Sequence, residues 1–127
     1  MSKPNPSSDS DPCWVHYVAA VNGEQIHYVR AGQGDPIVLL HGWPQTWYMW
    51  RKVIPALAQK YTVIAPDLRG FGQSSKPIDG YDKRTVAEDI YQLVKSLGFE
   101  KIFLVGHDFG GPTAYAYASA HPEVVRR

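Results

Sequence analysis

Hydrophobic residues gather in short runs along the chain, and turn residues separate these runs. Two strand-like runs, Trp14 to Val21 and Gln25 to Val29, flank Asn22-Gly23, a pair that tolerates positive φ and favours a tight hairpin turn. Three later runs lack polar alternation, which is typical of strands buried on both faces. They are Ile37 to Leu40, Tyr61 to Ala65 and Lys101 to Val105. The pattern predicts an antiparallel start followed by buried strands.

A helix is predicted between the second and third buried runs. Five apolar residues there are spaced by four, three, one and three positions, which places them on one helical face. They are Val86, Ile90, Leu93, Val94 and Leu97. Thr85 with Glu88 has the spacing of a capping box, and Gly98 follows as a C-terminal stop. We therefore expect a helix that starts near Thr85 and ends before Gly98.

Two further helical segments complete an alternation of strands and helices. Apolar residues between 47 and 57 outline one segment, which we expect in two short pieces because Pro55 breaks or restarts a helix. Gly110 to Ala120 is Ala-rich and ends at a His-Pro pair, where the helical region is disfavoured. Such alternation after an antiparallel start predicts an α/β sheet with right-handed crossovers. We expect one domain over residues 13–127 after a disordered leader, residues 1–12, that is rich in Ser, Pro and Asp.

The composition is that of a globular protein with little net charge. The 127 residues are 44% hydrophobic, so they can bury one sizeable core. With 13 basic and 12 acidic residues, the chain has no long-range field that would draw it to nucleic acid or an anionic membrane. The single cysteine, Cys13, excludes an internal disulfide, and no stretch approaches the roughly 20 apolar residues of a membrane span. We expect a soluble, cytoplasmic protein without a metal or other cofactor; its oligomeric state is left open.

A glycine-flanked aspartate follows the last buried run. The segment Gly106-His107-Asp108-Phe109-Gly110-Gly111 leads directly into the Ala-rich helix. Small residues around a central reactive one are typical of the nucleophile elbow, a strained strand-to-helix turn that projects the central side chain. A helix N-terminus favours the ionised carboxylate by roughly 0.3 to 1 kcal/mol, and a carboxylate can attack an electrophilic carbon to form an ester. Asp108 is thus a candidate nucleophile; the alternative is a simple helix cap.

A second loop supplies candidate hydrogen-bond donors. His41-Gly42-Trp43-Pro44 comes directly after the run Ile37 to Leu40. In the nucleophile-elbow arrangement, a backbone N–H of this loop and that of the residue after the nucleophile form the oxyanion hole. We therefore expect Trp43 and Phe109 to be the donors, supported by His41, Gly42, Pro44 and the residues around Asp108. An ordinary strand-ending turn is the alternative.

Three stretches carry a resemblance to a known family. They are HGWPQTWYMW (41–50), APDLRGFGQSSKP (65–77) and LVGHDFGGPTAYAYA (104–118). With these stretches the chain resembles the N-terminal half of the α/β-hydrolase epoxide hydrolases and dehalogenases. The resemblance implies that Asp108 opens an epoxide or displaces a halide, giving an alkyl-enzyme ester. It also implies a His base with an acidic partner and, in epoxide hydrolases, two cap tyrosines. In the family these groups lie beyond the position of Arg127, although that of the acidic partner varies.

Individual residues help to separate the branches of this family. Haloacetate dehalogenases of this fold carry Arg directly after the nucleophile and again three residues later, where this chain has Phe109 and Pro112. Many haloalkane dehalogenases place Asn and Trp where this chain has Trp43 and Phe109, and a phenyl ring has no donor for a halide. The 41–50 segment is most similar to epoxide hydrolases. The expected substrate is a small apolar molecule, an epoxide or, as the alternative, a halogenated compound.

The remaining histidines, tyrosines and charged residues favour structural roles. His107 is expected to point away from the site, and His16, His27 and His121 have no metal-ligand spacing. Packing is expected for Tyr115 and Tyr117, and a turn with an ion-pair network for Asp67 and Arg69.

No histidine follows His121, so the ester could form without being hydrolysed. We expect the chain to be a fragment of a longer hydrolase, and we expect this fragment to lack the cap and the C-terminal strands. The alternative is a non-enzymatic protein that binds through an exposed sheet edge.

Overall fold

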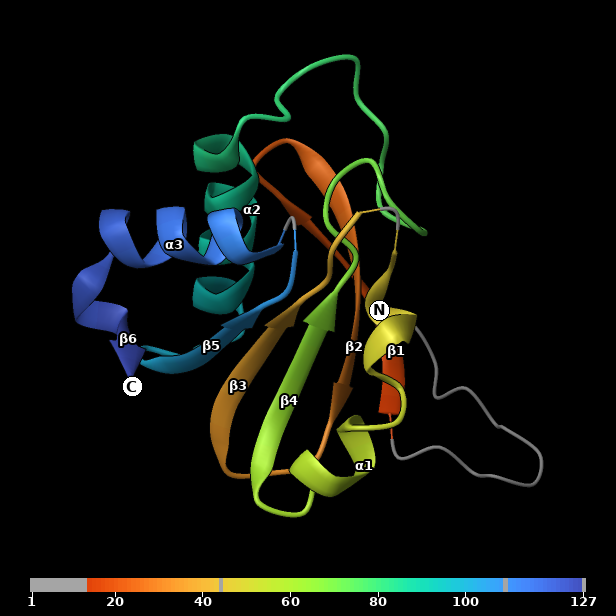
Figure 1. Ribbon diagram of the computed structural model, residues 1–127, viewed down its shortest axis with the longest axis vertical. Coiled ribbons are helices and arrows are strands. Elements are labelled where there is room, and N and C mark those ends of the chain that lie inside the picture. Colours follow the sequence, from red (N-terminus) through yellow and green to blue (C-terminus); the bar gives the residue numbers. More distant parts are fainter. Residues whose placement is uncertain (1–13, 44, 109, 127) are drawn as a thin grey trace.

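A mixed six-stranded sheet forms the centre of the structure, a computed structural model that describes residues 14–43, 45–108 and 110–126 (Figure 1). Its strand order is β1-β2-β4-β3-β5-β6. The strands are β1 (Trp14–Val21), β2 (Glu24–Ala31), β3 (Asp35–Leu40), β4 (Tyr61–Pro66), β5 (Ile102–Gly106) and β6 (Val125–Arg126). β3 pairs in parallel with β4 and β5, whereas β2 is antiparallel to β1 and β4. The predicted α/β class is confirmed; the expected leader, residues 1–12, lies outside the described residues.

The N-terminal hairpin turns where the sequence predicts. Asn22 has φ 51° and Gly23 has φ 79°, so both central residues occupy the left-handed region that a two-residue turn of this kind requires. The register then pairs Val21 with Glu24 and Trp14 with Ala31. This hairpin forms one edge of the sheet.

Helices cover the two faces of the sheet (Figure 1). They are η1 (Trp47–Trp50), α1 (Ile54–Leu57), α2 (Lys83–Ser96), α3 (Gly110–Ala120) and η2 (Pro122–Val124). The segment around Pro55 does form two short pieces, η1 and α1, which contact β3 and β4. On the opposite face, α2 and α3 pack against each other, and α3 contacts β3 and β5. The alternation of strands and helices therefore places both site loops at the carboxyl ends of β3 and β5.

The predicted capping box of α2 is wrong. The helix begins at Lys83 and its cap is Asp82, whose carboxylate accepts bonds from the backbone N–H of Thr85 at 3.1 Å and from its hydroxyl at 2.8 Å. Thr85 therefore lies inside the first turn, and Glu88 bonds Gln92 instead of the helix start. Asp82 competes successfully because its short carboxylate reaches the free N–H groups of that turn. The stop at Gly98, with φ 86°, is as predicted.

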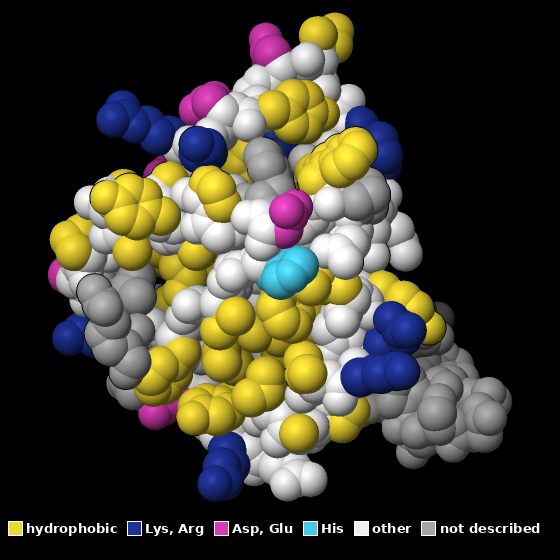
Figure 2. Space-filling model, viewed as in Figure 1, with side chains coloured by type: hydrophobic (Ala, Val, Ile, Leu, Met, Phe, Trp, Pro, Cys, Tyr) yellow, Lys and Arg dark blue, Asp and Glu magenta, His cyan; other side chains and the backbone are white. Residues whose placement is uncertain are grey.

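The prediction that the strands are buried on both faces is confirmed for β3 and β4 but is wrong for the end of β5. Five of the six residues in each of β3 and β4 are buried. In β5, Ile102 is buried whereas Val105 is 38% exposed. The difference arises because η1 and α1 contact β3 and β4 on this face of the sheet. Figure 2 shows hydrophobic side chains gathered on the same side of the molecule.

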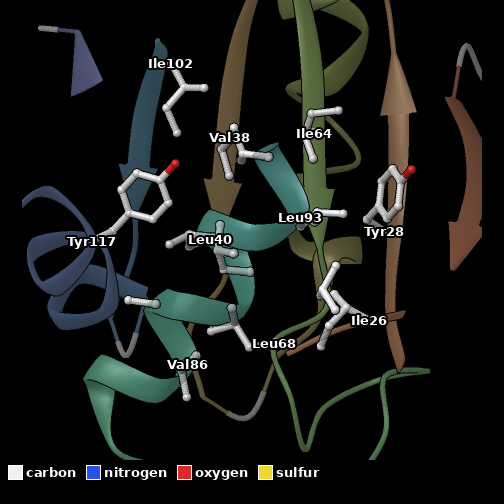
Figure 3. Close-up of a cluster of buried hydrophobic side chains, with 14 residues drawn as sticks. Ile26, Tyr28, Val38, Leu40, Ile64, Leu68, Val86, Leu93, Ile102 and Tyr117 are labelled. Atoms are coloured by element: carbon white, nitrogen blue, oxygen red, sulfur yellow. The ribbon is translucent and has the colours of Figure 1, made fainter. Parts of the chain in front are cut away.

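The larger core lies between the sheet and helices α2 and α3 (Figure 3). Leu93 and Val86 of α2 belong to the same cluster as Leu40 of β3 and Ile64 of β4. Tyr117 enters the same cluster from α3 and is fully buried, while Tyr115 on that helix is 76% exposed. Of the two tyrosines expected to have packing roles, only Tyr117 therefore packs inside this core.

Replacing Tyr117 by Phe is expected to stabilise the protein by about 1 kcal/mol, because a buried hydroxyl without a partner loses its bonds to water. Among the described residues, the Tyr117 hydroxyl finds no hydrogen-bond partner. The free energy of unfolding in urea measures the gain. Tyr115→Phe, on the exposed side of the same helix, serves as the control and should change nothing. A destabilised Tyr117→Phe protein would show that the hydroxyl has a partner.

Candidate active site

The two site loops meet at the carboxyl ends of adjacent parallel strands. Leu40 and Gly106 are paired in the β3–β5 register, so the segments that follow them run side by side. The backbone N–H of His107 donates to the carbonyl of Leu40 at 3.1 Å and ties the loops together. The ends of β3 and β5 thus bring the described residues 41–43 and 106–108 side by side.

Asp108 occupies the turn between β5 and α3. Its φ is 55°, and apart from Asn22 in the hairpin it is the one described non-glycine residue with positive φ. Its side chain is exposed, and Oδ2 accepts a hydrogen bond of 3.1 Å from the backbone N–H of Trp43. A strained backbone at a polar, exposed position is a feature that clusters at functional sites. Phe109 and Pro44, the other predicted members of these loops, lie outside the described residues.

Close backbone approaches explain three of the site glycines. A Cβ on Gly42 would lie 2.5 Å from the Cβ of Asp108, and one on Gly106 would lie 2.3 Å from the carbonyl oxygen of Gly110. A Cβ on Gly110 would lie 2.4 Å from the carbonyl oxygen of Leu40. At Gly111, by contrast, no atom lies within 4 Å of an added Cβ. Three of these four positions therefore need glycine to let the loops pack.

Gly110→Ala and Gly111→Ala are expected to have opposite effects. The first pushes α3 away from β3 and should destabilise the protein by roughly 1 to 3 kcal/mol, as overpacking does. The second adds a methyl group in open space on a helix and should stabilise by up to about 1 kcal/mol. Urea denaturation of the two variants measures both. Equal effects at the two positions would contradict the packing described for Gly110.

His41 lies fully buried at the start of its loop and bonds two backbone groups. Its Nε2 accepts from the N–H of Leu68 at 2.9 Å, and its Nδ1 lies 2.8 Å from the carbonyl oxygen of Gly42. Because a backbone N–H only donates, Nε2 carries no proton and Nδ1–H is the donor to Gly42. Burial lowers the pKa of the ring, although the Gly42 carbonyl and Asp67 oppose this effect. The imidazole is therefore neutral.

Asp67 binds the other end of the loop that begins at His41. Its carboxylate accepts the backbone N–H of Trp47 at 2.8 Å and that of Gln73 at 3.0 Å. Nδ1 of His27 donates to it at 2.7 Å, and Nε2 of His27 lies 2.9 Å from Nδ1 of His16. Burial alone would raise the pKa of Asp67, but the bonds from His27, Gln73 and Trp47 outweigh it and hold this pKa below its ordinary value. The expected structural role of Asp67 is confirmed. Its link to His27, and through His27 to His16, is not predicted from the sequence.

Arg69 and Asp89 form the ion pair expected in this region. The guanidinium makes two bonds to the carboxylate, Nε to Oδ2 at 2.6 Å and Nη2 to Oδ1 at 2.7 Å, and both side chains are buried. Nδ2 of Asn22 donates to the same carboxylate at 2.8 Å. Because Asp89 lies on α2, the pair joins the 67–73 loop to that helix.

Acidification is expected to lower stability in two steps. Burial lowers the pKa of His41 from its ordinary value of 6.5. Burial and, as a smaller cause, repulsion from His27 lower the pKa of His16 from the same value. The unfolded chain then binds these protons more readily, so their contribution is complete above pH 6.5 and is lost below it. Asp67, with a depressed pKa, adds stability that is lost only below its ordinary value of 3.8. The urea midpoint should hold from pH 8 to about 7 and then fall; a midpoint that rises towards pH 5 would contradict this assignment.

Two further histidines singled out in the sequence lie next to Asp108 and after α3. His107 is exposed next to Asp108, and His121 stacks on Tyr91 with ring centroids 3.5 Å apart. Across the described parts of the chain, no group of three or more His, Cys, Asp or Glu side chains is arranged for a metal ion. Nor does any helix in those parts have the length and apolar character to cross a bilayer.

The comparisons with known proteins show the family to which this chain belongs. The model of the α/β-hydrolase fold family matches residues 35–127, and the chain belongs to this family. It is 56% identical to the soluble epoxide hydrolase of Corynebacterium sp. (strain C12) over 89% of the chain and 40% of that protein. It is 47% identical to a fluoroacetate dehalogenase of Burkholderia sp over 79% of the chain and 34% of that protein. The solved structure of the epoxide hydrolase CorEH without ligand superimposes with TM-score 0.87 at 55% identity, covering 88% of the chain and 40% of that structure. The chain thus spans about two fifths or less of the length of these relatives.

Proposed function

We propose that this chain carries the nucleophile of an epoxide hydrolase-like enzyme and that Asp108 is this nucleophile. The observation that carries the proposal is the exposed carboxylate on a turn with φ 55°, facing the backbone N–H of Trp43. The similarity to a soluble epoxide hydrolase at 56% identity supports the choice of substrate. The substrate is a small apolar epoxide, and the protein acts in the cytoplasm.

The contact with Trp43 supports a proposal in which the two carboxylate oxygens have different tasks. Oδ1 attacks a ring carbon of the epoxide, the ring C–O bond breaks, and the ring oxygen keeps the electron pair and takes a proton. Oδ2 becomes the ester carbonyl oxygen, still facing the Trp43 N–H at the observed distance of 3.1 Å. When water adds to this carbonyl, negative charge develops on Oδ2, where a preformed donor stabilises it most. We propose the N–H of Phe109 as the second donor.

The 127-residue chain on its own is proposed to stop at the ester. Water needs a general base to attack it, and four of the five histidines are engaged elsewhere, while the fifth, His107, is expected to point away from the site. His41 bonds Gly42 and Leu68, His16 and His27 bond each other, and His121 stacks on Tyr91. The base and its acidic partner are therefore proposed to belong to the full-length enzyme, together with the groups that protonate the ring oxygen.

Product analysis of the full-length protein tests the proposed reaction. Styrene oxide, fluoroacetate and a short chloroalkane are offered separately, and diol and halide are measured. We expect diol from styrene oxide and little fluoride from fluoroacetate, since no guanidinium stands at Pro112 to grip a carboxylate. Fluoride release without diol formation would instead support the dehalogenase alternative, which the 47% identity to a fluoroacetate dehalogenase keeps open.

A further inference from the structure

The peptide group between Gly42 and Trp43 is the part of the site whose orientation matters most. Its N–H donates to Oδ2 of Asp108 at 3.1 Å. A planar trans peptide points its C=O and N–H in opposite directions, so fixing the carbonyl of Gly42 also fixes the N–H of Trp43. Gly42 has no side chain to hinder rotation of this peptide. Its orientation must therefore be held by hydrogen bonds.

Two donors hold the carbonyl oxygen of Gly42. The backbone N–H of Gln45 donates to it at 2.8 Å, within the loop itself. The Nδ1–H of His41 donates at the same distance of 2.8 Å, from a fully buried ring. Rotation of the peptide would break both bonds and turn a carbonyl oxygen towards the carboxylate of Asp108.

The ring of His41 is itself fixed from outside the loop. Leu68, which follows β4, donates its N–H to Nε2, and Phe71 packs its ring edge-on at 5.1 Å between centroids. With Nε2 engaged as an acceptor, only Nδ1 can carry the proton of a neutral imidazole. Phe71 and Leu68 thus lock both the position and the tautomer of the ring.

We propose that His41 is a positioning residue for the Asp108 site, whose Nδ1–H holds the 42–43 peptide so that the Trp43 N–H faces the carboxylate. This inference rests on the proposed function for its effect on chemistry. In the alternative role, His41 does not orient the peptide, and the hydrogen bond from the Leu68 N–H to its Nε2 only joins two loops. The two roles use different nitrogens of the same ring.

Two substitutions separate these roles in the full-length protein. His41→Asn can keep a donor near the place of Nδ1 and loses the acceptor for Leu68, whereas His41→Gln can keep that acceptor and loses the donor to Gly42. With styrene oxide in single-turnover experiments, His41→Gln should lower the rate constant of ester hydrolysis about tenfold with little change in KM, as loss of one aligned hydrogen bond does. His41→Asn should retain most of that rate.

A second measurement does not depend on chemistry. The Trp43 amide proton, observed with selective 15N-Trp labelling and assigned by its loss in Trp43→Phe, should resonate downfield because it donates to a carboxylate. His41→Gln should move it upfield and His41→Asn much less.

A normal rate and amide shift in His41→Gln would overturn the proposal, as would equal losses in both variants. If the unsubstituted protein forms no ester, the proposed function fails, and the amide shifts alone decide the role of His41.

Discussion

Asp108→Ala in the full-length protein is expected to lower epoxide turnover by roughly four orders of magnitude or more, the effect of removing a covalent nucleophile. The reason is that no other described carboxylate accepts the N–H of Trp43, as Oδ2 of Asp108 does at 3.1 Å. Diol formation measures the loss, and circular dichroism shows that the fold is retained. Because Ala tolerates a positive φ of 55° no better than Asp does, stability should be equal or slightly lower.

The matched control is Asp79→Ala. Asp79 is an exposed aspartate in the loop before α2. This variant should keep its turnover, because Asp79 contributes only its backbone carbonyl to Arg69. An Asp108→Ala protein that still forms diol at a tenth or more of the normal rate would leave Asp108 with a capping role at the start of α3.

Asp89→Ala is expected to destabilise the protein strongly, by about 3 to 5 kcal/mol, the cost of leaving one member of a buried ion pair without its partner. The Arg69 guanidinium would lose both of its bonds to the carboxylate, at 2.6 and 2.7 Å, and Asn22 would lose a third. The free energy of unfolding in urea measures the effect. Since the pair fastens the 67–73 loop, turnover should fall as well.

Glu88→Ala, the neighbouring substitution on α2, is the control. Glu88 is partly exposed and contacts Gln92 at 3.1 Å and His121 at 3.4 Å. Such surface contacts contribute about 0 to 1 kcal/mol, so this variant should unfold near the normal midpoint. If Asp89→Ala loses no more than Glu88→Ala, Arg69 must be satisfied by other groups.

The strands and the position of the site could be predicted because their signals are local. Asn22-Gly23 defines its own turn, and apolar runs define β3 and β4 without reference to the rest of the chain. The glycines around Asp108 likewise mark a turn between a strand and a helix. The start of α2 was missed because Asp82 lies before the apolar periodicity, while Thr85 with Glu88 fits the same capping pattern.

The supporting contacts could not be predicted, since they join segments that only the strand order brings together. His27 meets Asp67 because β2 lies beside β4, and His41 meets Leu68 because β4 lies beside β3. No pattern within one segment reveals such pairs. The exposure of Val105 depends in the same way on which helices cover each strand.

The central claim is that Asp108 forms an ester with the substrate, and the fate of solvent oxygen tests it most directly. The full-length protein turns over styrene oxide in 18O-labelled water, and peptide mapping by mass spectrometry then locates the label. We predict that the peptide containing Asp108 gains 18O only when the epoxide is present, because water attacks the ester carbonyl and leaves its oxygen in the carboxylate. Diol formation with an unlabelled Asp108 would contradict this account, because water would then attack the epoxide directly.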